Sequence, residues 1–314
     1  MYDSRPPSLD QFTGCLLGLA LGDALGAPFE GGWLERGLWR RIGTTRDGEM
    51  RWTDDTQMSL DLAESLLANG ALDADDLAQR FARSYHWSRG YGPGAAKLLK
   101  RIAHGQPWQQ ANTTVYPNGS YGNGGAMRAP VLALAFAQPA ALSQAVQTAT
   151  RITHAHPLGI EGAQLIAHAT TAALCSATPT ELLAAAAAQA QQSEFQCRLQ
   201  CARDWLSAAT PPSARQVARE LGNGIQASTS CVTAIYLAAR FLAQPFVELN
   251  AFTRQVGGDV DTIGAMSGAI WGAARGQTEL PQTLLAKLEQ RERLERVAVA
   301  ICHSPKTRPL LKLR

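Results

Sequence analysis

Glycine recurs at every fourth position of the stretch GCLLGLALGDALG, at Gly14, Gly18, Gly22 and Gly26. Residues four apart lie on one face of an α-helix, so this spacing predicts a helix with a bare glycine stripe. Glycine is disfavoured inside a helix by about 1 kcal/mol relative to alanine. We therefore expect the stripe to bring another backbone closer to this helix than side chains would permit.

A second stripe occurs in GGDVDTIGAMSGAIWGAARG, at Gly264, Gly268 and Gly272. Two helices with glycines four apart can bring their backbones together, and the packing that they gain offsets the lost helix propensity. The helix of residues 14–26 is therefore predicted to lie in the centre of a helical bundle, against the helix of residues 262–275.

Small residues four apart are also typical of paired transmembrane helices. Here Asp23 interrupts the apolar run, and Asp10 and Glu30 flank it. The uncharged part is too short for a bilayer span, which needs roughly 20 mostly apolar residues. The N-terminal MYDSRPPSLD lacks the basic start and small-residue cleavage site of a secretory signal. We expect a soluble, cytoplasmic protein with no membrane partner.

Composition narrows the range of protein classes to which the chain could belong. The 314 residues are 46% hydrophobic, enough for a large core, and the net charge of +3 argues against a dedicated nucleic-acid binder. The six cysteines are scattered and form no paired metal-ligand motif, as expected for reduced thiols. Cys197 and Cys201 could share a helix face, but packing is a better interpretation than a zinc site.

Apolar residues at helical spacing dominate the chain, and no run with a period of two indicates a strand. There is no linker long enough to separate two domains and no internal repeat. We predict one all-α domain over residues 1–314, a compact helical bundle. Its motif-bearing core covers about residues 12–275, and a C-terminal helix and basic tail occupy residues 280–314. The predicted helices include residues 61–72, 74–87, 94–105, 130–138, 142–156, 162–177, 179–191, 195–209, 230–244 and 280–290.

Two short acidic stretches stand at predicted helix starts. In RWTDDTQM, Thr53, Asp54 and Asp55 precede a helix, and Thr53 or Asp54 suits its N-cap. In GGDVDTIG, Asp259, Asp261 and Thr262 follow a Gly-Gly turn before another helix.

Helix capping explains either stretch alone, because the positive end of the helix dipole favours an acid there. A cap needs one oxygen, however, whereas each stretch offers two carboxylates and a threonine hydroxyl. Mg²⁺ and Mn²⁺ prefer such clustered oxygen ligands. Two clusters that face each other could hold two cations roughly 3.5 to 4 Å apart and activate a water between them.

The stretch NGSYGNGGAMRAPVLAL leads from a glycine-rich loop into a helix. Backbone N–H groups of such a loop can bind phosphate oxygens, helped by the helix dipole. An ordinary tight turn is the alternative interpretation, and the loop is neither a Walker loop nor a dinucleotide fingerprint. Tyr121 offers an aromatic surface for a ribose or base, and His154 and His156 in THAHPLG are candidate substrate contacts.

Five motifs in this order resemble those of the ADP-ribosylglycohydrolase family. They are GCLLGLALGDALGAPFE, WTDDTQM, GNGGAMRAP, THAHPLG and GGDVDTIGAMSGAIWGA. That family includes dinitrogenase reductase-activating glycohydrolase and the vertebrate ADP-ribosylhydrolases. The resemblance implies an all-α bundle with two Mg²⁺ (or Mn²⁺) ions, which hydrolyses the bond between C1″ of ADP-ribose and an acceptor. The partner would be an ADP-ribosylated protein or a small molecule that contains ADP-ribose.

The resemblance also implies roles for individual residues. Glu30 would orient or deprotonate the attacking water, Asp55 would share in catalysis, and Asp23 would support the site from behind. Metal ligation would involve Thr53, Asp54, Asp55, Asp259, Asp261 and Thr262. Substrate binding would involve Ser120, Tyr121, Gly122, Asn123, Gly124, Gly125, Met127 and His154.

The type of ADP-ribose linkage that is hydrolysed is predicted from three further strings. The strings GSYGNGGAMR, THAHPLG and TSCVTAIY resemble the branch that acts on O-linked ADP-ribose in serine conjugates, poly(ADP-ribose) and O-acetyl-ADP-ribose. An arginine-directed hydrolase, a noncatalytic binding or immunity protein of the same fold, and a metal phosphohydrolase are the alternatives. The presence of every acidic ligand position counts against the noncatalytic alternative.

Overall fold

The computed structural model describes residues 6–304, except for the side chain of residue 35, and this part of the chain is built from helices. Extended segments pair there only through isolated bridges, at Thr44–Met50, Met50–Leu288 and Gly122–Gln226. The predicted all-α fold is confirmed. The α-helices are α1 (Leu9–Gly26), α2 (Trp33–Ile42), α3 (Asp54–Asn69), α4 (Ala74–Ser84), α5 (Pro93–Ala103), α6 (Trp108–Val115), α7 (Ala129–Ala135), α8 (Pro139–Arg151), α9 (Pro157–Leu174), α10 (Pro179–Ala187), α11 (Ser193–Ser207), α12 (Ala214–Glu220), α13 (Cys231–Arg240), α14 (Phe246–Val256), α15 (Val260–Arg275), α16 (Gln282–Leu285) and α17 (Arg291–Cys302).

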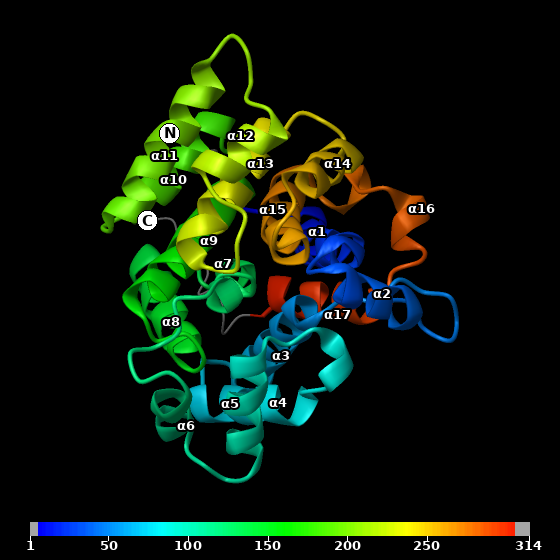
Figure 1. Cartoon of the computed structure of the whole chain (residues 1–314), viewed down its shortest axis with the longest axis vertical. Coiled ribbons are helices and arrows are strands. Elements are labelled where there is room, and N and C mark those ends of the chain that lie inside the picture. Colours follow the sequence, from blue (N-terminus) through cyan, green and yellow to red (C-terminus); the bar gives the residue numbers. More distant parts are fainter. Residues whose placement is uncertain (1–5, 305–314) are drawn as a thin grey trace.

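Helices α1 and α15 lie side by side at the centre of the molecule (Figure 1). Their glycine stripes face each other, as predicted. A Cβ added at Gly18 would overlap the carbonyl oxygen of Gly268, and one added at Gly272 would overlap that of Gly14. The two backbones are therefore in direct contact, and no side chain fits between them.

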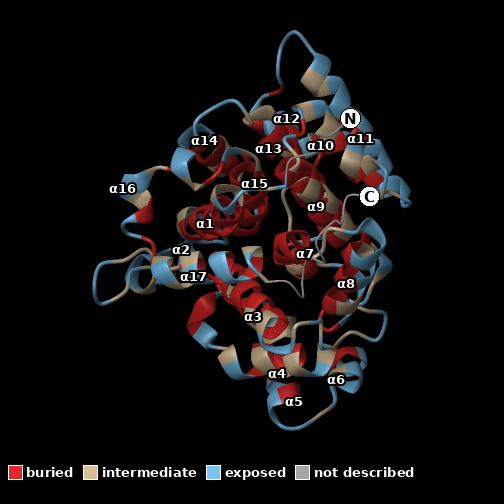
Figure 2. Ribbon diagram, turned by 180° about the vertical axis from the view of Figure 1, so that it is seen from behind, coloured by how far each residue is buried: buried red, intermediate tan, exposed pale blue. Residues whose placement is uncertain are grey.

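Burial explains the apolar character of α1 on all sides. By length and composition, the segment Leu9–Phe29 is the one membrane-span candidate among the described residues. However, 83% of its 18-residue apolar stretch is buried inside the protein. Figure 2 shows α1 and α15 as largely buried helices. A helix that is covered on every side needs no polar face.

The other helices surround this pair in groups. Helices α3 to α6 form the lower part of the view in Figure 1, α9 to α13 the upper left, and α14 and α16 the right. Helix α9 contacts α7, α8, α10, α13 and α15, whereas α17 packs against α1 and α3. The N-terminal ends of α3 and α15, which carry the acidic stretches, meet beside the C-terminal end of α1.

Two sequence predictions about helix bounds are wrong. The helix expected over residues 280–290 is reduced to α16, because the following backbone pairs with residue 50 instead: Met50 N–H donates to the Lys287 carbonyl at 2.6 Å, and Glu289 N–H to the Met50 carbonyl at 3.0 Å. The helix expected over residues 142–156 ends at Arg151, which leaves His154 and His156 in a loop. The predicted C-terminal helix is α17, and the basic tail beyond residue 304 lies outside the described residues.

Candidate active site

A cavity of about 230 Å³ lies where the N-terminal ends of α3 and α15 meet the glycine-rich loop. Predicted site residues from three distant parts of the chain line it together. They are Glu30, Asp54, Asp55, Ser120, Gly122, Asn123, Gly124, Met127, His154, Asp259, Asp261 and Thr262. The expected convergence of the two acidic stretches with the glycine-rich loop is therefore present in the fold.

Asp23, at the end of α1, holds the first acidic stretch in place. Its carboxylate accepts hydrogen bonds from the Thr53 backbone at 2.9 and 3.0 Å, from the Thr56 backbone at 3.1 Å and from the Thr56 hydroxyl at 2.5 Å. Burial raises the pKa of Asp23 to about 6, although these hydrogen bonds oppose that rise. Thr53 is the N-cap of α3, and its hydroxyl accepts from the Asp55 backbone at 3.3 Å.

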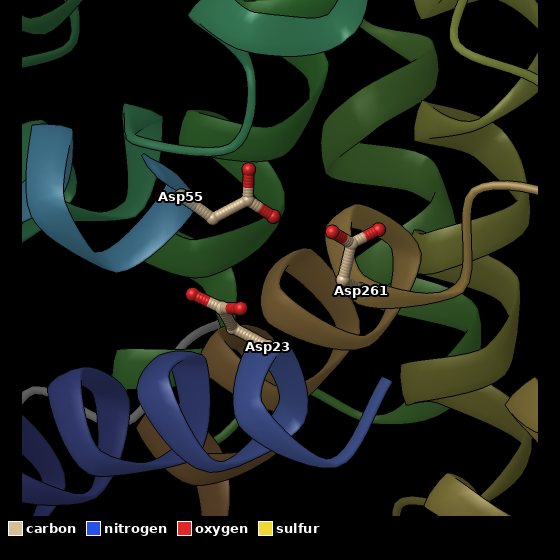
Figure 3. Close-up of side chains that lie close together, drawn as sticks. All are labelled: Asp23, Asp55 and Asp261. Carbon is tan, nitrogen blue, oxygen red and sulfur yellow. The ribbon is translucent and has the colours of Figure 1, made fainter. Parts of the chain in front are cut away.

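Carboxylates from three helices point into one space at the bottom of the cavity. The close-up in Figure 3 shows Asp23 on α1, Asp55 on α3 and Asp261 on α15, with carboxylate oxygens that lie within 4.8 Å of one another. Glu30, Asp259 and Asp261 form a second group by the same measure. The Thr262 hydroxyl donates to Asp55 Oδ1 at 3.3 Å and joins the two acidic stretches directly.

This crowding makes negative charge costly at the site. Burial is the main cause that raises the pKa values of Asp54, Asp55 and Asp261 well above their usual range, and neighbouring carboxylates raise them further. Within the described part of the chain, Asp55 Oδ2 and Asp261 Oδ1 are buried without a hydrogen-bond partner. Buried carboxylate oxygens are normally satisfied by a donor or a cation, so this donor set fits hard divalent cations such as Mg²⁺.

The pKa shifts predict how a divalent cation will change thermal stability. Burial raises the pKa of Asp23 and Asp259 from 3.8 to about 6 in the folded protein, so the metal-free fold loses stability as pH rises through this range. A bound cation offsets that loss. At one fixed Mg²⁺ concentration, about 100 times the Kd at pH 7.5, we expect Tm to rise by roughly 5 °C near pH 7.5 and by less near pH 5. Differential scanning fluorimetry with a Na⁺ control of equal ionic strength measures this, and equal shifts at both pH values would contradict it.

The glycine-rich loop is fixed on both sides. The Asn123 backbone donates to the Ile225 carbonyl at 3.0 Å, and the Ala227 backbone donates to the Tyr121 carbonyl at 3.0 Å. The Asn123 side-chain amide donates to Asp259 at 2.5 Å and to the Ser230 hydroxyl at 3.1 Å. Asn123 therefore connects the loop to the second acidic stretch.

Arg128, at the end of the same loop, is buried without a carboxylate partner among the described residues. Its guanidinium donates to the Gly124 carbonyl, to the Ala149 carbonyl at 3.1 Å and to the Thr153 hydroxyl at 2.8 Å. Arginine has no acceptor, so the Thr153 hydroxyl accepts from it. The same hydroxyl lies 2.8 Å from His154 Nδ1, and the imidazole tautomer decides which of the two groups donates.

Burial lowers the pKa of His154 to about 3, and the nearby Arg128 charge adds to the effect, so the imidazole is neutral. Its Nε2 lies against Gly122 and Gly124, where an added Cβ would approach the ring closely. His154 thus places a neutral ring nitrogen beside the glycine-rich loop.

A second buried arginine supports the first acidic stretch from behind. Arg89 makes a bidentate ion pair with Glu289, at 2.7 and 2.9 Å, and donates to the Trp52 carbonyl at 2.8 Å. Its guanidinium lies 3.7 Å from the centre of the Trp52 ring, and the indole N–H donates to the Glu289 carbonyl at 2.9 Å. The segment just before Thr53 is therefore fastened to residues near the end of the chain.

Three predicted site residues do not line the cavity. Thr53 caps α3, Tyr121 is half exposed and stacks edge-on with His156 at 5.8 Å, and Gly125 packs against Thr150. Their proposed contacts stay predictions. Lining residues that the sequence analysis missed are Met58, Gly90, Gly92, Pro93, Gly94, Ala95, Tyr116, Thr153 and Ile225. GYGPG at residues 90–94 was the available signal, because it resembles the other glycine-rich turn before a helix.

Comparison with known proteins agrees with the geometry. The family model for ADP-ribosylglycohydrolase matches residues 4–309. ADP-ribosylhydrolase ARH3 of Gallus gallus is 32% identical, over 94% of this chain and 93% of that protein, and the Homo sapiens protein is 31% identical with the same coverage. The ADP-ribosyl-[dinitrogen reductase] glycohydrolase of Rhodospirillum rubrum is 29% identical, over 91% of this chain and 92% of its own length.

A solved structure gives the same assignment. An ADP-ribosylglycohydrolase-related protein complex aligns with a TM-score of 0.71 and 29% identity, and covers 94% of this chain and 98% of that one. The family match over nearly the whole chain and these relatives leave no ambiguity about its ancestry. The chain belongs to the ADP-ribosylglycohydrolase family and is a hydrolase of ADP-ribose linkages.

Proposed function

We propose that this protein is a metal-dependent hydrolase that releases ADP-ribose from O-linked acceptors. One observation carries the proposal: Asp55 and Asp261 converge from remote helix starts. Among the described residues, each has a buried carboxylate oxygen that lacks a partner. Resemblance of the glycine-rich loop and of THAHPLG to the O-linked branch supports the choice of linkage. Serine conjugates, poly(ADP-ribose) and O-acetyl-ADP-ribose are the expected substrates.

Two divalent cations, Mg²⁺ or Mn²⁺, would be held by the carboxylates of Asp54, Asp55, Asp259 and Asp261, with Thr53 and Thr262 beside them. Cations bound there would supply positive charge that stabilises oxygen anions in the reaction. Asp23 is committed to the backbone of residues 53 and 56, so its contribution is to hold the first acidic stretch in place.

The chain's own residues account for the remaining steps. The glycine-rich loop offers backbone N–H groups to the diphosphate, and His154 Nε2 forms a hydrogen bond with the ribose. Glu30 lies on the segment after α1, half-buried, with a carboxylate oxygen close to Asp259 and Asp261. From there it orients the attacking water and removes its proton as the C1″ bond breaks, and the proton passes on to the leaving acceptor.

Glu30→Gln separates this role from ligand binding. The amide has nearly the same shape but cannot accept the proton, so we expect kcat to fall by at least about 10²-fold. The Kd for ADP-ribose, measured by calorimetry, should change by less than about threefold, because Glu30 is not needed to hold the diphosphate. Glu248→Gln, an exposed change on α14, is the matched control. Unchanged turnover in Glu30→Gln would remove the assigned role.

The proposed function is tested by incubating the protein with serine-linked, arginine-linked and O-acetyl ADP-ribose, with and without Mg²⁺ or Mn²⁺. Free ADP-ribose from the serine-linked and O-acetyl substrates, only when a cation is added, is the expected result. Preferential release from arginine would assign the protein to the arginine-directed alternative. Binding of ADP-ribose without release from any substrate would favour the noncatalytic alternative, and release of phosphate would favour a phosphohydrolase.

A further inference from the structure

A second cavity, of about 690 Å³, lies along the exposed face of α5. Its lining is dominated by positively charged and polar side chains, which recur at helical spacing on one side of the helix. We call this cavity the basic groove, and its lining residues are Pro93, Ala96, Lys97, Lys100, Arg101, His104 and Gln106. No acidic residue lines it.

The segment that contains α5 carries an excess of positive charge. Residues 74–116 contain six Lys or Arg and two Asp, although the whole chain has a net charge of only +3. Among the described residues, neither Lys97 nor Lys100 forms an ion pair, and the guanidinium of Arg101 reaches only the Gln106 side chain, at 3.1 Å. These cations are therefore available to an anion from solution.

The basic groove adjoins the active-site cavity at one residue. Pro93, at the first turn of α5, lines both cavities, and its neighbours Gly92, Gly94 and Ala95 line the active site. A helix rises 1.5 Å per residue, so Lys97 and Lys100 lie only about 6 to 10 Å beyond Pro93 along α5. A substrate that extends out of the active site across Pro93 enters the basic groove.

We propose that the basic groove binds the pyrophosphate of a second ADP-ribose unit when the substrate is poly(ADP-ribose). This inference rests on the proposed O-linked activity, and it assigns that activity a polymer-binding surface. Every unit of such a polymer carries two phosphates, so any chain that crosses Pro93 brings anions to Lys97, Lys100 and Arg101. A protein acceptor brings negative charge only where its sequence is acidic, so the polymer matches this surface more generally.

The test compares the wild-type protein with the Lys97→Glu/Lys100→Glu double variant on two substrates. With poly(ADP-ribose), we expect the variant to raise KM about tenfold, and its KM should depend less on salt between about 50 and 200 mM, because charge contacts to phosphates are lost. With a peptide that carries one ADP-ribose on serine, kcat and KM should stay unchanged. Arg215→Glu/Arg219→Glu on α12 introduces the same change of charge away from both cavities and is the control.

The outcomes separate this inference from the proposed function. If the wild-type protein cleaves neither substrate, the proposed function fails. If it cleaves both and the α5 variant matches the α12 control on the polymer, the basic groove has no role in binding it. A variant that loses the serine peptide as strongly as the polymer, but only when the peptide is acidic, would identify the groove as a site for acidic protein acceptors and overturn the polymer assignment.

Discussion

Asp55→Asn and Asp261→Asn are each expected to lower cation-dependent kcat/KM by at least about 10³-fold, equivalent to about 4 kcal/mol of transition-state stabilisation. Each carboxylate belongs to the group in which Asp23, Asp55 and Asp261 come within 4.8 Å. Each also has a buried oxygen that finds no hydrogen-bond partner among residues 6–304. Removing one charge weakens cation binding, which would offset the repulsion among several carboxylates at such short separation.

The same variants should leave the fold intact, because the substitution keeps the side-chain volume and removes a buried charge whose pKa is already raised. Circular dichroism should show unchanged helicity, and Tm without metal should not fall, whereas the stabilisation by Mg²⁺ should largely disappear. Asp47→Asn, in an exposed loop, is the matched control and should behave as wild type. Full cation-dependent activity in both site variants would refute the metal assignment.

Gly18→Ala and Gly268→Ala should each destabilise the protein by about 3 kcal/mol or more, at the upper end of the range for overpacked cores. At both positions the added methyl group would overlap a backbone carbonyl oxygen of the facing helix. Backbone atoms in the centre of a bundle cannot turn aside as a flexible side chain can, so α1 and α15 must separate along their length.

Gly37→Ala provides the control for this prediction. Gly37 lies within α2, and an added Cβ would meet nothing within 4 Å. There the ordinary helix preference for alanine applies, and we expect a gain of about 0.5 to 1 kcal/mol. Chemical denaturation measures all three variants. If Gly18→Ala were as stable as wild type, the close contact between α1 and α15 would be wrong.

The sequence predicted the features that depend on local spacing. The two glycine stripes identify α1 and α15 as partners, because only a close backbone contact justifies so many glycines in helices. The acidic stretches predicted a shared site, since each contains more oxygen ligands than a helix cap uses. Both inferences needed only the identity of residues at fixed intervals.

Features that depend on long-range pairing could not be predicted in this way. Residues 280–290 have helical spacing, but their backbone instead pairs with residue 50, a partner that no local pattern specifies. Nothing in the sequence around Arg89 or Glu289 indicates that the two form a buried ion pair beside Trp52. Arg128 likewise gains its role only because the loop that contains Thr153 and His154 returns to it.

The contact between α1 and α15 has a consequence for synthesis in the cell. Translation delivers α1 early, yet its glycine face has no partner until α15 emerges more than 200 residues later. At about 5 to 20 residues per second, that interval is on the order of 10 to 50 s. During most of this interval, an apolar segment remains uncovered on the nascent polypeptide, with Asp23 and Asp55 already made but Asp261 still missing. A ribosome that stalls there holds a polypeptide that has the first acidic stretch but not the second.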